Sequence, residues 1–149
     1  MRLFGHPVHP MLVAFPIALL ALTPIWDGIA WAGVLADART AGYFCALAGL
    51  IGGGLALVTG FIDLIKIPAA ETAAARVALI HASCALSALT LYGIAFAFRG
   101  GRAAVPSVGV LALEAAGALA LVATGWLGGH LVFRHGVGVR TGGGSANGR

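Results

Sequence analysis

Four long apolar stretches dominate this chain of 149 residues. They run over about residues 11–31, 41–65, 74–98 and 108–133. Each is long enough to supply the roughly 20 apolar residues with which a helix crosses the hydrocarbon core of a bilayer. Short connectors that hold charged residues, prolines and glycines separate them. The pattern predicts an all-α integral membrane protein, in which residues 1–140 form one four-helix transmembrane bundle.

The composition supports a lipid environment. The chain is 60% hydrophobic and only 9% charged, whereas a soluble domain carries about 25% charged residues. So little polar surface cannot cover a protein of this size in water. The net charge of +4 could suggest binding to nucleic acid, but the basic residues are scattered and form no stripe. We therefore expect the lipid bilayer, and no nucleic acid, as a partner.

Four spans place both chain ends on one side of the membrane, which we call side A; the opposite side is side B. Side A receives most of the basic residues: Arg2, Lys66, Arg76, Arg134, Arg140 and Arg149. Side B receives Arg39, Arg99 and Arg102. Because positive charge favours the cytoplasm, side A is predicted to be cytoplasmic. The glycine-rich residues 141–149 are predicted to form a flexible C-terminal tail.

The histidines all fall in the side A half of the predicted bundle. They are His6, His9, His81, His130 and His135. Asp63, near the end of the second span, belongs to the same half. Polar side chains within membrane helices are costly and usually face the interior of the bundle. The topology therefore predicts a polar cluster near side A.

Such a cluster suits a cofactor. Neutral imidazole is a good ligand for haem iron, zinc or copper, and two histidines on facing helices can clamp a b-type haem. On depth, the favoured pair is His81 with His130, and His9 or His135 replaces His130 if the chain ends fold inward. Arg76, Lys66 and Arg134, near the same interface, are candidate partners of haem propionates.

Two alternatives to a haem remain open. A metal ion other than haem iron would draw on His81, His9, His6, His135 and Asp63. Without any cofactor, His81 would bond to a backbone carbonyl or to Asp63, and His6 and His9 would form a rigid turn between prolines.

Two acidic residues lie in the side B half. Asp27 is near the end of the first span, and Glu114 is about two turns into the fourth. A buried acid can mark a path for protons or ions. The alternative is a structural ion pair with Arg39, Arg99 or Arg102.

Short segments of the second and fourth spans are similar to each other. Residues 59–62 (Thr-Gly-Phe-Ile) resemble residues 124–127 (Thr-Gly-Trp-Leu). Two related helical hairpins would produce such a repeat.

Three motifs resemble a known family. They are Gly5–Val13, Gly60–Asp63 and the run from Gly125–Gly129 into His135–Val139. Together they resemble the bacterial membrane proteins grouped as a domain of unknown function, DUF-2231, over nearly the whole chain. The resemblance implies four helices in a bacterial inner membrane and no established activity.

The same family is similar in fold to the four-helix membrane cytochromes that hold b haems. Some of its members are joined to iron–sulfur or cytochrome c modules, which suggests electron transfer by analogy. The family's pattern carries over onto His6, His9, His81, Asp63 and His135. This chain departs from it at Ala14, where the family often has a further histidine. His130, at a position that the family fills variously, is a candidate to compensate.

Three functions follow from these observations. The first is a small electron-transfer protein that holds one b-type haem near the cytoplasmic face and passes electrons to a quinone or a partner subunit. The second is a cofactor-free accessory subunit of a larger membrane complex, or a homo-oligomer. The third is an ion or proton transporter. A catalyst is not expected, because the histidines lack a serine or cysteine nucleophile with a base and an orienting acid.

Overall fold

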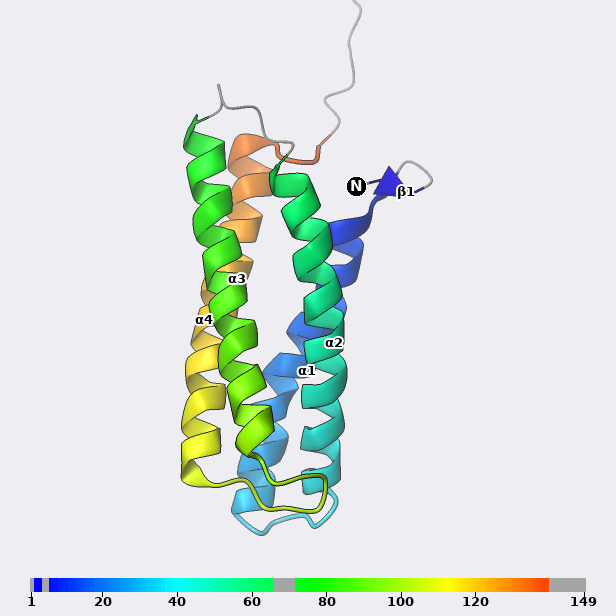
Figure 1. Cartoon of the computed structure of the whole chain (residues 1–149), viewed down its shortest axis with the longest axis vertical. Helices are drawn as coiled ribbons and strands as arrows, with labels where there is room; N and C mark the ends of the chain where they lie inside the picture. Colours follow the sequence, from blue (N-terminus) through cyan, green and yellow to red (C-terminus); the bar gives the residue numbers. More distant parts are fainter. Residues whose placement is uncertain (1, 4–5, 66–71, 140–149) are drawn as a thin grey trace, which may run out of the picture.

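The computed structural model describes residues 2–3, 6–65 and 72–139, and the side chains of residues 8–65 and 73–139. Four helices make up almost all of it (Figure 1). They are α1 (Val8–Trp31), α2 (Ala38–Leu64), α3 (Thr72–Phe98) and α4 (Val108–His135). Their bounds lie within a few residues of the predicted spans, which confirms the all-α, four-helix prediction.

The outside of the bundle is apolar. All four helices are long enough to cross a membrane, with a mean hydropathy of 1.7 to 2.0. Large apolar side chains such as Phe15, Trp126 and Phe133 are 73%, 79% and 92% exposed. Exposed apolar surface on this scale is suited to lipid and not to water. The chain is therefore an integral membrane protein.

The helices form two antiparallel hairpins. α1 packs along α2, and α3 along α4, far more extensively than α2 packs on α3 or α1 on α4. The connections after α1 and α3 lie at one end of the bundle, side B, while α1 and α3 begin, and α2 and α4 end, toward side A (Figure 1). Before α1, β1 (Arg2–Leu3) pairs antiparallel with β2 (His6–Pro7).

Local signals fix the ends of α4. The Ser107 side chain accepts a hydrogen bond from the Val110 N–H, which caps the first turn. Gly136 ends the helix in the left-handed region at φ 62° and donates its N–H to the Val132 carbonyl. Gly100 and Gly101, at φ 83° and 98°, allow the chain to turn sharply after α3.

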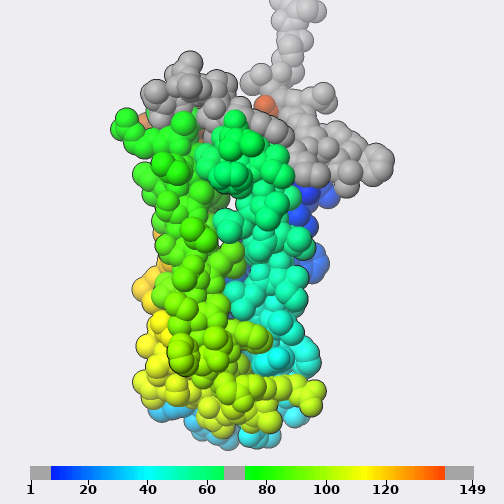
Figure 2. Space-filling view, viewed as in Figure 1, coloured from blue at the N-terminus to red at the C-terminus, as the bar shows by residue number. Residues whose placement is uncertain are grey.

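The core is built from small residues and lies mainly in the middle of the bundle and toward side B. Alanines predominate among the buried apolar residues, and Leu20 and Tyr92 are the largest of them, each 1% exposed. Small side chains let helix backbones approach closely within a membrane. Toward side A the packing is looser, and Figure 2 shows the surface hollowed between α2 and α3 there.

Candidate functional site

A cavity of about 1100 Å³ separates the two hairpins in the side A half. All four helices line it, together with the turn that follows α4. Its volume slightly exceeds the range of roughly 300–1,000 Å³ that is typical of cofactor and small-molecule sites. Most of the lining is apolar, and the histidines among it are His9, His81 and His135.

His9 lies in the first turn of α1 and points to α2. Its Nδ1 lies 2.9 Å from the Ala56 carbonyl oxygen and 3.4 Å from Thr59 Oγ1. A carbonyl oxygen can only accept a hydrogen bond, so Nδ1 is the donor. In the neutral imidazole, Nε2 then carries the lone pair.

His81 repeats this arrangement in the second hairpin. Its Nδ1 lies 2.9 Å from the Thr124 carbonyl oxygen of α4. The same argument makes Nδ1 the donor and leaves the lone pair on Nε2. This hydrogen bond agrees with the prediction that a backbone carbonyl could hold His81, but it occupies only one of the two ring nitrogens.

His9 and His81 also each pack against a glycine. In both cases the glycine lies four residues after the residue whose carbonyl the histidine contacts. A Cβ added to Gly60 would lie 2.8 Å from His9 Cε1, and one added to Gly128 would lie 3.2 Å from His81 Cε1. The two hairpins therefore hold their histidines in the same way. Their register differs from that of the sequence match, because Thr124 corresponds to Ala56 and not to Thr59.

The two imidazoles face each other across the centre of the bundle. Their ring centroids are 6.5 Å apart and the planes are perpendicular, at 90°. They come from α1 and α3, which occupy diagonal corners of the bundle. Ala56 lies eight residues before the end of α2, so the pair is about 12 Å below the helix end at side A.

The other predicted site residues lie nearer the surface of side A. His130 contacts His135 with a ring-centroid distance of 5.4 Å and does not line the cavity. His135 and Asp63 line it. Arg76 and Arg134 are exposed and outside its lining. The His6 side chain and Lys66 lie outside the described residues.

A metal site built from protein ligands alone has little support. Among the described side chains, no three histidine, cysteine, aspartate or glutamate residues come close enough together to hold a metal ion. The His9–His81 pair is therefore a two-ligand arrangement within that part of the chain.

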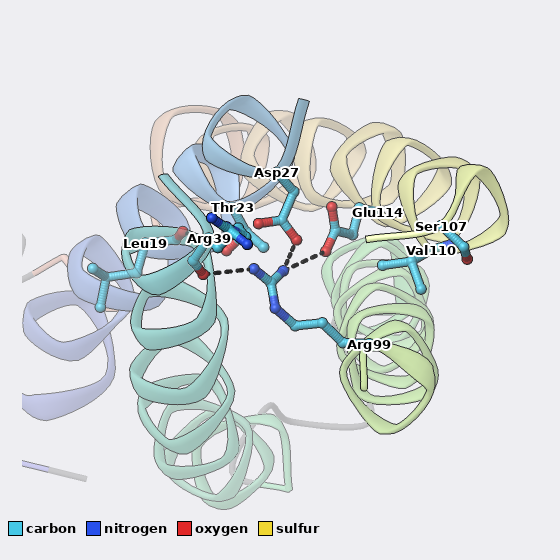
Figure 3. A network of polar contacts seen from close by, with 8 residues as sticks. All are labelled: Leu19, Thr23, Asp27, Arg39, Arg99, Ser107, Val110 and Glu114. Carbon is cyan, nitrogen blue, oxygen red and sulfur yellow. Dashed lines mark hydrogen bonds and ion pairs between the residues drawn. The ribbon is translucent and has the colours of Figure 1, made fainter. Parts of the chain in front are cut away.

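The two acidic residues of the side B half belong to a separate cluster (Figure 3). Asp27 of α1 forms an ion pair with Arg99, and Arg99 Nη1 lies 3.9 Å from Glu114 Oε1 of α4. Arg99 Nη2 donates to the Arg39 carbonyl of α2 at 2.8 Å. Asp27 is fully buried, and Arg99 and Glu114 are each 2% exposed. Of the three arginines considered from the sequence, Arg99 is the one that pairs with both acids.

This cluster connects all four helices. The sequence places Arg99 among the basic residues of side B, and the structure shows that its side chain is buried within the bundle.

Comparison with known families agrees with this architecture. The family described as "Predicted membrane protein (DUF2231)" matches residues 5–141. The chain belongs to this family. The match confirms the resemblance found in the sequence. The matched residues of this DUF2231 protein include His9, His81 and the side B cluster. Neither a curated protein nor a solved structure matches the chain.

Proposed function

We propose that this DUF2231 protein is a small electron-transfer protein that holds one b-type haem between His9 and His81. The observation that carries the proposal is the facing pair of imidazoles. Each is oriented by a backbone carbonyl through Nδ1, and both line the same large cavity inside the membrane.

The spacing of the rings suits a shared metal ion. With the roughly 2.0–2.1 Å typical of metal–imidazole bonds, two Nε2 atoms on opposite sides of one ion place their ring centroids about 6 Å apart. The observed separation is 6.5 Å. The distance between the rings is therefore compatible with one ion bound by both Nε2 atoms.

The number of ligands favours a haem over a bare ion. Structural zinc usually takes four protein ligands and catalytic zinc three, whereas the described side chains offer no group of three. A porphyrin brings its own four nitrogens, so its iron needs only two axial ligands. Two histidines on diagonal helices supply that number.

Glycines provide room for a flat macrocycle. A plane placed between the two rings extends toward α2 and α4, where glycines line the cavity: Gly53, Gly60, Gly125, Gly128 and Gly129. The close contacts at Gly60 and Gly128 show that a side chain at either position would push into an imidazole. The small residues thus support the same function as the histidines.

The carbonyl bonds would tune the ligands. A histidine that donates its second ring N–H to a carbonyl is fixed in orientation and is a more basic ligand. Haem iron with two histidine ligands supplies one-electron transfer. A haem held by both His9 and His81 would have no open position for a substrate, so we propose a carrier and not a catalyst.

The cavity mouth indicates where a redox partner would approach. Asp63, His135 and Gly136–Gly138 line its side A end. The excess of basic residues on side A supports a cytoplasmic position for it, in what we propose is a bacterial inner membrane. The partner would be a quinone or another subunit that meets this end of the bundle.

An absorption spectrum of the detergent-purified protein, oxidised and then reduced with dithionite, tests the proposal. We expect a Soret band, sharp α and β bands on reduction, and one iron per chain. His9→Ala and His81→Ala should each abolish the bands while the helical content stays unchanged. His130→Ala is the matched control and should keep the spectrum.

Other outcomes would contradict this assignment in distinct ways. A colourless, metal-free protein after expression with ample haem would favour a cofactor-free accessory subunit. A colourless protein that contains zinc or copper would keep the histidine site but remove the haem. A spectrum lost in His130→Ala and kept in His9→Ala would make His81 and His130 the ligand pair.

A further inference from the structure

The ion cluster of side B lies within the apolar part of the bundle. Asp27 is four residues before the end of α1, and Glu114 is six residues after the start of α4. At about 1.5 Å per residue, both carboxyl groups are roughly 6–9 Å from the helix ends. Figure 3 shows the Arg99 guanidinium between them.

The charges of this cluster do not balance. It contains two carboxyl groups, on Asp27 and Glu114, and one guanidinium, on Arg99. The Arg39 guanidinium is engaged elsewhere, because it donates to the Ala36 and Ala103 carbonyls at the surface. If both acids were ionised, the buried cluster would carry one excess negative charge.

Such a charge is costly in this environment. An ionised carboxylate without a counter-charge costs several kcal/mol in a protein interior, and buried groups of this kind usually become neutral. We propose that the cluster is a proton-binding site, in which Asp27 stays paired with Arg99 and Glu114 holds one exchangeable proton.

The geometry selects Glu114 as the proton carrier. Asp27 is in direct contact with Arg99, whereas Glu114 is 3.9 Å from the same nitrogen. Glu114 Oε2 is buried and has no hydrogen-bond partner among the described residues. A carboxylic acid can donate a hydrogen bond from this side, which a carboxylate cannot.

Tyr92 of α3 is a second buried polar group close to Glu114. Its side chain is 1% exposed, and its hydroxyl, like Glu114 Oε2, has no hydrogen-bond partner in the described part of the chain. A Cβ at Gly117, one turn after Glu114, would lie 2.9 Å from the Tyr92 ring, so this ring packs against α4 next to the cluster. A phenol can donate and accept, so it can serve either protonation state of the acid.

A metal ion is a poorer occupant than a proton. The Arg99 guanidinium already lies between the two carboxyl groups and would repel a second cation. The α2 backbone closes the other side of Asp27, where even a Cβ on Gly42 would collide with its carboxylate. A proton neutralises a carboxylate without needing the space that a metal ion would occupy.

Infrared spectroscopy of the purified protein at neutral pH tests the inference. A protonated carboxyl group has a carbonyl-stretch band that carboxylates lack. We expect one such band from this cluster, moved by transfer into D2O and by ¹³C-labelling of glutamate. Glu114→Gln should remove it, and Asp37→Asn, at an exposed acid on the same side, should leave it unchanged.

Asp27→Asn gives a second test that does not depend on the first variant. It leaves one carboxyl group and one guanidinium, so Glu114 should ionise and the same band should disappear. No glutamate band in the unmodified protein, or a band that persists in both variants, would overturn the proposal. The experiment needs no haem, so its outcome is independent of the proposed electron-transfer function.

Discussion

The two halves of the bundle use polar side chains in opposite ways. Toward side A, each histidine bonds within its own hairpin: His9 of α1 to α2, and His81 of α3 to α4. Toward side B, Arg99 connects one hairpin to the other through Asp27 and the Arg39 carbonyl. Bonds within a hairpin orient side chains and leave the hairpins apart, whereas bonds between hairpins hold them together.

This difference explains where the cavity lies. The hairpins separate around about 1100 Å³ in the half where His9 and His81 each bond within their own hairpin. They close in the half where the buried ion pairs and Tyr92 fill the centre. We infer that side B supplies most of the stability between hairpins, and that side A is the part available to a ligand.

Removing the central cation should have the largest effect on stability. Arg99→Met leaves Asp27 and Glu114 buried without a counter-charge. Breaking a buried ion pair in this way costs about 3–5 kcal/mol, and thermal unfolding in detergent should report it. Arg102→Gln, at an exposed arginine of the same connection, should change stability by less than about 0.5 kcal/mol. Equal effects of the two variants would show that the cluster does not hold the hairpins together.

Crowding the same cluster should have the next largest effect. A Cβ on Gly42 of α2 collides with the Asp27 carboxylate and lies 3.0 Å from Arg99 Nη2. Overpacking of this kind costs about 1–3 kcal/mol, so Gly42→Ala should lower the unfolding temperature. Gly54→Ala is the control on the same helix, because nothing lies within 4 Å of its added Cβ. If the Gly42→Ala and Gly54→Ala proteins were equally stable, the Asp27 carboxylate would not lie against Gly42.

The sequence predicted the spans closely, but it left the partner of the two acids open among three arginines, for physical reasons. Length and hydropathy determine which segments cross a membrane, so the four helices were predicted within a few residues of their ends. Which helices face each other depends on packing. Arg99 follows the third span directly, and nothing in the periodicity shows that its side chain points into the interior.

On side A, a small change should affect the ligand more than the fold. In Gly60→Ala the added Cβ would lie 2.8 Å from His9 Cε1, so the ring must move. Disturbing the support of a metal ligand typically costs about 10–100-fold in affinity, and haem titration of the apoprotein should show this loss. The unfolding temperature should change little, because the ring can move into the cavity.

Gly129→Ala is the matched control for that change. Gly129 lines the same cavity, but nothing lies within 4 Å of its added Cβ. Haem affinity should therefore stay close to that of the unmodified protein. Equal losses at Gly60 and Gly129 would mean that the cavity volume, and not the position of His9, controls binding.

The proposed ligand pair, His9 and His81, is a second feature that the sequence alone did not single out. Depth along the chain favoured His81 with His130, and His9 was an alternative that required the N-terminal end to fold inward. The structure starts α1 at Val8, level with Ala56 and two turns below the end of α2. Because α1 begins about two turns below the end of α2, His9 in its first turn lies at the depth of His81. Periodicity does not reveal such an offset between neighbouring helices.

The smallest expected effect is on haem affinity, in variants of the threonines next to His9 and His81. Thr59 Oγ1 lies 3.4 Å from His9 Nδ1, in addition to the Ala56 carbonyl at 2.9 Å. The Thr124 hydroxyl donates to the Ala120 carbonyl, and His81 contacts only the Thr124 backbone. Thr59→Val should therefore weaken haem binding by about 0.5–1 kcal/mol, the net contribution of one hydrogen bond. Thr124→Val should have no effect on the affinity, because the carbonyl remains. If Thr59→Val reduced the affinity as much as Gly60→Ala, the hydroxyl and not the carbonyl would orient His9, and the two hairpins would hold their ligands by different means.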